Sequence, residues 1–432
     1  MSRGDCVIEV GAGVVDRETE WGNFKGRARQ VNEAERPGRG GDDERREVLL
    51  VGRAPTLMWA MPYLMSRCGF HVDVITTSQL LRASRFVREL MLVGETDAIT
   101  PTAYAHICDR EKPYDWVIAC EDQSLLELSG MDWPEDREPA YLPLQRRGER
   151  GHIYSKIGLS RMLEAGGVRT PPFRVAGSVA EALEGARELG YPVYVKEDAG
   201  SGGAGVYQCE TDADLCGLEG LFAAGPLLVQ KKIAGREVAL SALFFEGRLA
   251  HFSYGVVERA TAAQAISAVR LHLPLSLVDA RVYEELCDLG RALEANGVVS
   301  ITALEAADGS GLNYFEADMR PTVWVDAARL YGDDVAPRIR GWFERGEILS
   351  REDLAMAGGC EPMRVTHFQR LKLWEVLVNR FGVWRTIPWA ERRMVLHLMG
   401  ARMWAPASRK VVPKRVRQAV KRGMTAARIA FP

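Results

Sequence analysis

The sequence predicts an α/β protein whose central part is α+β, and three stretches carry this prediction. The segments "EVLLVGRAP" (47–55), "HVDVIT" (71–76) and "YDWVIACED" (114–122) contain short apolar runs that we interpret as buried strands. Helical patterns accompany them, and strand–helix–strand spacing of this kind is typical of a parallel sheet. Further along, strand-like segments flank glycine-rich turns, which predicts antiparallel hairpins.

Length and composition fit a protein with more than one domain. The chain has 432 residues, of which 47% are hydrophobic and 26% charged, as in ordinary soluble globular proteins. No apolar run approaches the roughly 18 residues needed to span a bilayer, and the start has no charged-then-apolar signal pattern. The eight cysteines include no C-x-x-C pair, which favours reduced thiols over a disulfide framework or a structural zinc site. We therefore expect a cytoplasmic protein.

We divide the chain into five segments at changes in composition and pattern. They are a polar tail, an N-terminal parallel α/β domain, a linker helix with a small lid domain, a larger antiparallel-sheet domain, and a helical extension with a basic tail. Their expected bounds are 1–46, 47–150, 151–234, 235–345 and 346–432. Because 15 of the residues 17–46 are charged, the first segment cannot bury much apolar surface and we expect it to be mobile.

In the N-terminal domain, polar residues follow two of the expected strands. Arg53 follows the first strand, before a turn and an apolar helix to about residue 68, and Glu121 and Asp122 follow the third. Ligands of open parallel sheets bind beyond the carboxyl ends of the strands, so these side chains are candidates for a site. The alternative is turn and helix-cap chemistry, which uses the same residue types.

The middle of the chain alternates between helical and strand patterns. A helix within 152–173 ends at a Gly-Gly pair and leads into a Pro-Pro connector. For the lid domain we expect helix 178–189, strand 191–197, strand 205–209, helix 211–223 and strand 226–232. For the larger domain we expect strands 237–245 and 248–257, helix 279–295, and a strand pair at 299–306 and 312–320. From about residue 335 onward the apolar spacing predicts helices, including "RLKLWEVLVNRFGVW" and "ERRMVLHLMGARMW".

The stretch "GSGGAG" (200–205) fits the dinucleotide-binding spacing G-x-G-x-x-G. That fingerprint must open a helix, whereas Gly205 is followed by "VYQCET", whose β-branched and aromatic residues predict a strand. We therefore expect the loop at the tip of a hairpin. Glycine backbone N–H groups can approach phosphate oxygens closely, and Lys196 adds a positive charge on the entering strand. We interpret the stretch as a phosphate-binding loop, with a plain flexible hairpin tip as the alternative.

A second hairpin, "SITALEAADGSGLNYFEADMRP" (300–321), carries several carboxylates. If its turn is centred between residues 310 and 311, Glu305 lies opposite Glu316. Period-2 alternation then places Glu316, Asp318 and Arg320 on one face, with Glu305 pointing the same way. Opposed like charges destabilise a sheet, and a bound Mg²⁺ would remove that repulsion. The alternative is a solvated face on which Arg320 is an ion-pair partner.

Together these motifs resemble the ATP-grasp superfamily over about residues 47–340. "VYVKEDAGSGGAGV" is similar to the family's strand, lysine and glycine-rich flap over the triphosphate. "LLVQKKIAGREVALSALFFEGRL" is similar to its interdomain linker, which holds adenine, followed by the Gly-x-Glu whose carboxylate takes the ribose. "TALEA" and "NYFEADMRP" resemble its paired metal-binding strands. The resemblance implies the ATP-grasp architecture, with a pre-ATP-grasp domain, a small lid and a larger antiparallel-sheet domain.

The resemblance also implies a role for each matching residue. The residues expected at the nucleotide phosphates are Lys156, Lys196 and the covering loop of Gly200, Ser201, Gly202, Gly203, Ala204 and Gly205. Those expected around adenine, through backbone groups, are Gln230, Lys231, Lys232 and Ile233, and Glu237 is expected to bind ribose. Those expected to hold Mg²⁺, or Mn²⁺ in its place, are Glu305, Glu316 and Asp318. Arg320 is expected to stabilise an acyl phosphate, and Arg259 or Arg270 to supply a further phosphate cation.

Three positions depart from the family's pattern. The family often has Lys-Pro where this chain has Lys-Glu at 196–197, and Asn-Pro-Arg where it has Asp-Met-Arg at 318–320. Asp can ligate Mg²⁺ as well as Asn can. An acidic residue often stands early in the linker where this chain has Lys231, which would place a cation near the nucleotide and leaves base or ribose preference open.

The implied reaction joins a small-molecule carboxylate to an amine through an acyl phosphate, with release of ADP and phosphate. It needs no protein nucleophile, and the sequence has no recognisable Ser/His or Cys/His constellation. The alternatives are carboxylate–thiol ligation, carboxylation, and a regulatory or scaffold protein that binds ATP without turnover. We expect no nucleic-acid partner. The oligomeric state stays open, with a homodimer as one option.

The basic tail bears on partners. The net charge is −2, but residues 401–432 hold nine Lys/Arg and no Asp/Glu, which leaves −11 on the first 400 residues. From Arg409 onward the partly amphipathic pattern indicates weak docking to an anionic membrane or an acidic partner. The alternative is a solvated helix packed on the acidic body of the protein.

Overall fold

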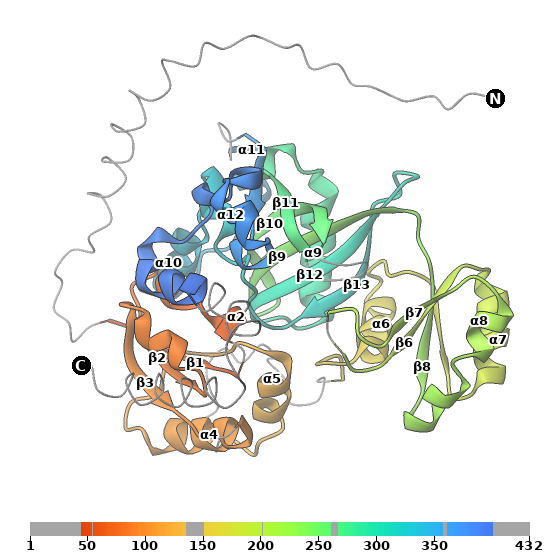
Figure 1. Cartoon of the computed structure of the whole chain (residues 1–432), viewed down its shortest axis with the longest axis horizontal. Helices are drawn as coiled ribbons and strands as arrows, with labels where there is room; N and C mark the ends of the chain where they lie inside the picture. The colour runs from red at the N-terminus through yellow and green to blue at the C-terminus, as the bar shows by residue number, and fades with distance from the viewer. Residues whose placement is uncertain are drawn as a thin grey trace, which may run out of the picture. The chain divides into compact units, whose positions relative to one another are not determined.

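The computed structural model describes residues 45–53, 55–94, 96–134, 151–200, 202–260, 267–356 and 361–400. The expected basic tail, and the expected polar tail apart from its last two residues, lie outside the described residues. One parallel and two antiparallel sheets organise the described part of the chain (Figure 1). They follow one another in the order that the sequence predicts.

The N-terminal sheet has the strand order β3-β2-β1-β4, and every pairing in it is parallel. Its strands are β1 (Glu47–Val51), β2 (His71–Thr76), β3 (Val87–Leu92) and β4 (Trp116–Ala119). The accompanying helices are α2 (Pro55–Met58), α3 (Met61–Arg67), α4 (Ile99–Asp109) and α5 (Asp122–Ser129). All of β4 is buried, as is usual for a parallel strand with both faces covered. The parallel α/β prediction is confirmed, although β3 and α4 were missed.

The lid sheet has the strand order β5-β8-β6-β7, and all its pairings are antiparallel. Its strands are β5 (Phe173–Ala176), β6 (Val193–Glu197), β7 (Val206–Cys209) and β8 (Leu227–Lys231), and its helices are α7 (Val179–Leu189) and α8 (Asp212–Cys216). Helix α6 (Lys156–Ala165) precedes the lid and packs Leu159 and Leu163 in the core of the central sheet. The hydroxyl oxygen of Ser178 accepts a hydrogen bond from the backbone N–H of Glu181 and so caps α7. Ala182 and Ala186 of α7 pack in one core with Val195 of β6.

The central sheet has the order β13-β12-β9-β10-β11-β14 and is antiparallel throughout. Its strands are β9 (Gly235–Phe245), β10 (Arg248–Ala260), β11 (Ser267–Leu273), β12 (Gly297–Ala306), β13 (Leu312–Asp318) and β14 (Met363–Thr366). Helix α9 (Ala280–Ala292) packs Leu286 and Leu289 in a core with Leu240 and Phe244 of β9. Because side chains alternate along a strand, Glu237 points to the opposite face, which we call the polar face.

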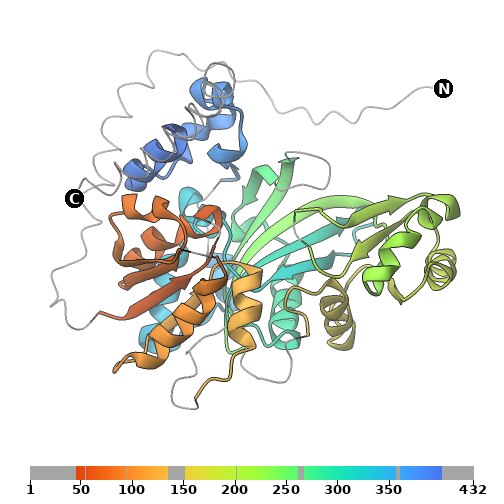
Figure 2. The same ribbon diagram turned by 60° about the horizontal axis from the view of Figure 1, so that its bottom comes forward.

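The C-terminal part of the described chain departs from the helical prediction in two ways. It contains α10 (Val335–Arg345), α11 (Arg351–Met356), α12 (Leu373–Leu377) and a helix at 392–400. The end of this segment is the dark blue ribbon at the upper left of Figure 2. However, β14 pairs with β11, so the segment beyond residue 346 supplies an edge strand to the preceding sheet. The stretch 370–384 also forms only one helical turn and a 3₁₀ stretch, because Phe381 and Gly382 adopt φ values of 58° and 67°.

Candidate functional site

The glycine loop lies at the tip of the β6–β7 hairpin, as the sequence predicts. Lys196 pairs with Val206 in the antiparallel ladder, so a strand and not a helix follows the loop. Gly200, Gly202 and Gly205 have φ values of 139°, 63° and 71°, which side chains other than glycine rarely adopt. The dinucleotide fingerprint is thereby excluded. The expected loop residue Ser201 lies outside the described residues.

Lys156 holds the base of this loop against the start of α6. Its ammonium group donates hydrogen bonds to the carbonyl oxygens of Glu197 at 3.1 Å and Gly200 at 3.2 Å. The carboxylate of Asp198 accepts from the hydroxyl of Ser155 and from the backbone N–H of Ile157, each at 2.8 Å. Burial lowers the pKa of Lys156, although nearby carboxylates oppose the shift. A positive charge is therefore fixed directly beneath the glycine loop.

Lys196 is a buried cation whose hydrogen-bonding partner is neutral. Its ammonium group donates to the side-chain oxygen of Gln230 at 2.7 Å and lies 4.9 Å from the ring centroid of Phe315. Burial lowers the pKa of Lys196 to about 8, with Glu316 opposing the shift and Lys156 adding to it. A buried ammonium without a directly bound carboxylate is suited to an incoming anion, because an anionic ligand would supply the missing countercharge.

Lys231 does not face the expected nucleotide side. Its ammonium group donates to the carbonyl oxygens of Leu189 at 2.6 Å and Gly190 at 3.1 Å, at the C-terminal end of α7. A cation there complements the helix dipole. The expectation that Lys231 places a charge near the nucleotide is therefore wrong. The backbone N–H groups of Lys231 and Lys232 donate to the carbonyl oxygens of Pro172 and Pro192.

The register of the acidic hairpin differs from the prediction. Thr302, and not Glu305, lies opposite Glu316, and Glu305 pairs with Leu312. The turn is centred two residues earlier than expected, and an irregularity in the ladder leaves Phe315 as an extra residue on β13.

Glu305 consequently lies on the α9 side of the sheet, away from Glu316. Its carboxylate forms an ion pair with Arg236 and accepts a hydrogen bond from the hydroxyl of Tyr254 at 3.3 Å. Arg236 pairs directly with Glu305 across β9 and β12, so the two side chains leave the sheet on the same face. The structure therefore does not bring Glu305 together with the other two expected metal ligands.

Glu316, Asp318 and Arg320 form the centre of the polar face, together with one residue of the N-terminal domain. The hydroxyl of Thr302 donates to Glu316 at 3.0 Å. Arg320 donates to Asp318 at 2.7 Å and to Asp122 at 2.8 Å. Asp122 is the first residue of α5, directly beyond the carboxyl end of β4. The strand-end position noted in the sequence thus carries an ion pair between the N-terminal domain and the hairpin.

The carboxylates of this centre repel one another. Burial and the neighbouring Glu316 raise the pKa of Asp318 well above its usual range, against the opposing charge of Arg320. Burial alone would lower the pKa of Arg320, but Asp318 and Asp122 raise it. A cation bound by Glu316 and Asp318 would relieve the repulsion that raises the pKa of Asp318.

Glu237 and Arg270 extend the polar face across the sheet. Burial raises the pKa of Glu237. The charge of Arg270 opposes this shift, and the charge of Glu316 adds to it. Arg270 is buried on β11, donates to the hydroxyl of Ser267 at 2.7 Å, and lies 4.4 Å from the ring centroid of Trp324. Its guanidinium group remains charged at neutral pH. Arg270 therefore belongs to the same electrostatic cluster as Glu316.

Arg259 is directed elsewhere. It donates to Glu375 at 2.8 Å and lies 5.5 Å from the ring centroid of Phe381, both in the C-terminal segment. Of the two arginines expected to supply a phosphate cation, the structure brings only Arg270 to the hairpin.

The carboxylates present fit a magnesium ion that is coordinated partly by a bound phosphate. Within the described ranges, no group of three or more His, Cys, Asp or Glu side chains could hold a metal. Glu316 and Asp318 remain as a pair on one face, separated by one residue. Mg²⁺ keeps several waters and is commonly held by one or two carboxylates together with substrate phosphates. The pair fits an ion that arrives with a phosphate ligand, and Glu305 does not fit it.

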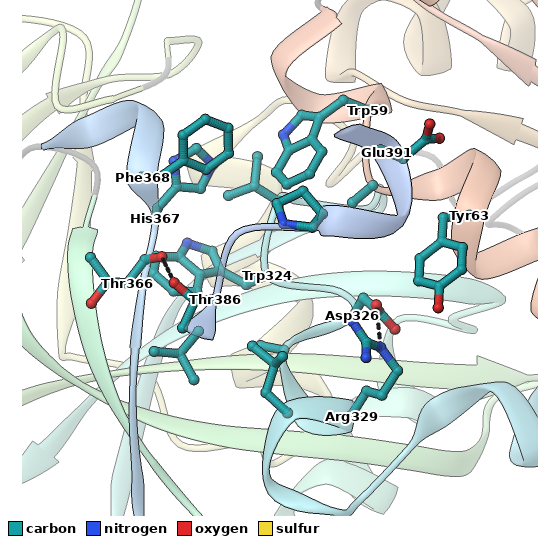
Figure 3. A pocket seen from close by; sticks show the side chains of 16 residues that line it. Trp59, Tyr63, Trp324, Asp326, Arg329, Thr366, His367, Phe368, Thr386 and Glu391 are labelled. Carbon is teal, nitrogen blue, oxygen red and sulfur yellow. Dashed lines mark hydrogen bonds and ion pairs between the residues drawn. The ribbon is translucent and has the colours of Figure 1, made fainter. Parts of the chain in front are cut away.

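An aromatic cavity of about 60 Å³ adjoins the polar face (Figure 3). Trp324 stands between the two, since its ring contacts Arg270 and also lines the cavity. The other walls come from the N-terminal domain, from the segment 323–330 that follows β13, and from the C-terminal segment, and they include Trp59, Asp326, Arg329, His367 and Glu391. Burial raises the pKa of Glu391 to about 7, although the hydroxyl of Ser84 donates to it at 2.5 Å. Sequence patterns gave no sign of this cavity, because its walls lie far apart in the chain.

Comparison with known proteins identifies the fold of the chain. No family model and no curated protein matches the chain. Among solved structures, the biotin carboxylase domain of the Hydrogenobacter thermophilus 2-oxoglutarate carboxylase, bound to MgADP, ADP and bicarbonate, is 16% identical with a TM-score of 0.56, over 72% of each chain. The ADP complex of N5-carboxyaminoimidazole synthetase from Staphylococcus aureus is 15% identical with a TM-score of 0.55, over 71% of this chain and 79% of that one. An L-amino acid ligase from Bacillus licheniformis is 14% identical with a TM-score of 0.51, over 71% and 78%. The likeness to these structures shows that the chain has the ATP-grasp fold.

Proposed function

We propose that the protein is an ATP-dependent ligase that activates a small-molecule carboxylate as an acyl phosphate and joins it to an amine. The observation that carries this proposal is the position of Glu316. Lys156, Lys196, Arg270 and Arg320 all interact electrostatically with this one carboxylate. Cations from the lid, the central sheet and the hairpin thus surround an acidic pair beneath a glycine loop. Such a cluster suits a triphosphate with its Mg²⁺.

Each part of the site has a proposed task. Lys156 and Lys196 bind the phosphates under the loop of residues 200–205, and the linker 230–233 receives the adenine through its backbone. Glu237 takes the ribose hydroxyls. Glu316 and Asp318 hold Mg²⁺, which would neutralise charge on the transferring phosphoryl group.

The proposed reaction has two balanced steps. A carboxylate oxygen of the substrate attacks the γ-phosphorus of ATP, and the bond to ADP breaks. An amine then attacks the carbonyl carbon of the acyl phosphate, phosphate leaves, and the nitrogen loses a proton. Arg320 is held between Asp122 and Asp318, so its guanidinium group is already oriented to stabilise the charge of the acyl phosphate.

Carboxylation is the second candidate reaction, with bicarbonate as the activated carboxylate. One structurally similar protein is a biotin carboxylase domain that was determined with bicarbonate. ATP binding without turnover is the third reading. The presence of Glu316, Asp318 and Arg320 in one cluster argues against it.

Phosphate release tests these alternatives. The purified protein is assayed with MgATP against a panel of amino acids, other carboxylates with amines or thiols, and bicarbonate. A pair of substrates that both stimulates release and yields an amide supports the ligase. Stimulation by bicarbonate alone supports the carboxylase, and bound ATP without stimulation by any member contradicts both.

A matched pair of variants tests the corrected acidic site. We expect Glu316→Gln to abolish turnover with the fold intact, whereas Glu305→Gln should retain it, because Glu305 lies on the other face with Arg236. Equal loss in both variants, with unchanged circular dichroism spectra, would contradict the assignment.

A further inference from the structure

Exposed apolar side chains concentrate in one short part of the C-terminal segment. Six of the ten large hydrophobic residues that are exposed in the described part of the chain lie between residues 374 and 396, and each is 50–68% exposed. We refer to these six exposed side chains as the tryptophan surface, and they are Trp374, Leu377, Val378, Trp384, Trp389 and Leu396. A monomeric soluble protein rarely exposes so many large apolar side chains together, so this surface calls for a partner.

Hydrogen bonds link Trp389 to Trp384 and Trp384 to α12. The indole N–H of Trp389 donates to the carbonyl oxygen of Trp384 at 2.9 Å, and that of Trp384 donates to the carbonyl oxygen of Val376 at 2.7 Å. Arg380 lies 5.5 Å from the ring centroid of Trp374. Because the indole N–H groups of Trp384 and Trp389 are used internally, the area that these two rings expose is hydrocarbon.

Within residues 362–400, the exposed charged side chains are basic. Residues 362–400 include two carboxylates, Glu375 and Glu391, and both are buried. The same stretch exposes six basic side chains. Arg364 forms an ion pair with Glu258 and Arg380 with Glu375, and the other four are Lys372, Arg385, Arg392 and Arg393. On the helix 392–400, Arg392 and Leu396 are four residues apart and share one face. Cationic heads and hydrocarbon are therefore presented side by side.

We propose that the tryptophan surface binds a membrane surface containing anionic lipid. Tryptophan and leucine enter the boundary between head groups and acyl chains, while arginine and lysine attract anionic head groups. Within the described ranges no helix has the length and apolar character to cross a bilayer, so the contact would be peripheral.

Charge argues against two other occupants. The chain's own residues 401–432 carry nine Lys/Arg and no Asp/Glu, so they would repel the basic residues of this surface. A second copy docked through the same surface would face it with the same charges. An acidic protein remains as the rival, and the experiment must distinguish it from lipid.

Vesicle sedimentation tests the proposal with the full chain. We expect the protein to pellet with vesicles of phosphatidylcholine and phosphatidylserine, to remain in solution with phosphatidylcholine alone, and to be released by salt. Each cation at an anionic surface contributes about fivefold to partitioning, so Arg392→Gln with Arg393→Gln should lower the partition coefficient by roughly 25-fold. Leu377→Ser with Leu396→Ser should lower it by at least about tenfold, because hydrocarbon is lost from the boundary.

Matched controls separate this surface from general effects. Leu277→Ser changes a leucine of similar exposure just before α9, and Arg281→Gln with Arg291→Gln removes the same charge from the exposed part of α9. Both should pellet like the unaltered protein, and all variants should keep its circular dichroism spectrum. The proposal is overturned if the protein ignores phosphatidylserine, or if the leucine variant binds unchanged. Displacement from the vesicles by soluble polyglutamate, combined with an unchanged leucine variant, would point to an acidic protein instead.

Discussion

The affinity for ATP should fall as the pH rises through about 8, because Lys196 loses its proton there. Burial lowers the pKa of this lysine from 10.5 to about 8 in the free protein. A triphosphate beside it would restore the favourable environment for the ammonium group and return the pKa toward 10.5. The triphosphate itself is already ionised above pH 7, since the second pKa of a phosphate lies near 6. The pH dependence in this range therefore belongs to the protein.

The size of the effect follows from the two pKa values. With a pKa of about 8 free and 10.5 bound, the dissociation constant should rise about 20-fold between pH 7.5 and pH 9.5. At pH 8 about half of the free molecules carry a neutral Lys196, so binding should take up roughly half a proton from this group. The underlying shift of 2.5 units corresponds to about 3 kcal/mol.

Calorimetric titration of ATP in buffers of different ionisation enthalpy measures both the affinity and the proton uptake. Lys196→Arg should bind with a flat pH profile, because a guanidinium group stays charged. Lys231→Met is the matched control, since that ammonium group caps α7, and it should retain the full pH dependence. An affinity that stays constant from pH 7.5 to 9.5 in the unaltered protein would refute the reasoning.

Three further predictions concern stability, measured by chemical or thermal unfolding. Glu391→Gln should stabilise the protein at pH 8 by up to about 3 kcal/mol and leave it nearly unchanged at pH 4, because a raised folded-state pKa costs stability as the pH rises from 4.5 through about 7; equal effects at both pH values would contradict this. Asp122→Asn should cost about 1–3 kcal/mol, because Arg320 loses a buried charge partner; an unchanged midpoint would contradict it. Gly235→Ala should cost at least about 2 kcal/mol, because an added Cβ would lie 2.1 Å from a carbonyl oxygen of β12; a neutral result would show that the strands can separate.

Local sequence patterns correctly predicted those elements in which an apolar run is bounded by clear turn residues. The strand 71–76 has the bounds that its sequence indicates, and the glycine loop follows β6 as expected. Arg53 and Asp122 were recognisable as strand-end residues, and each forms an ion pair at the carboxyl end of the parallel sheet. These features depend on a few neighbouring residues, which is why the sequence alone reveals them.

Features that depend on distant partners were missed. Strand β14 forms the edge of the sheet because it pairs with β11, although its own residues lie within a pattern that predicts helix. Strand β3 is mostly half-buried or exposed and includes Arg88 and Glu89, so it lacks an apolar run. The direction of Lys231 depends on where α7 ends in space. Because these neighbours are distant in the chain, local sequence patterns do not reveal them.

The register of the acidic hairpin shows how one residue decides the chemistry of the site. A shift of one position moves a side chain to the other face of a sheet, and the extra residue Phe315 leaves Glu316 on the polar face while Glu305 stays with Arg236. The neutral Thr302 then stands where a third carboxylate was expected.

The position of the neutral Thr302 opposite Glu316, where a carboxylate was expected, has an electrostatic consequence for the charged cluster. The candidate site brings together four cations, Lys156, Lys196, Arg270 and Arg320, and the carboxylates that interact with them, which are Glu237, Glu316, Asp318, Asp122, Asp198 and Glu197. A further carboxylate opposite Glu316 would add repulsion to a centre in which Asp318 is already driven toward its protonated form. With Thr302 opposite Glu316, no third carboxylate adds to the repulsion between Glu316 and Asp318. The anionic phosphates would then meet cations that the remaining carboxylates do not fully neutralise by direct contact, Lys196 foremost among them.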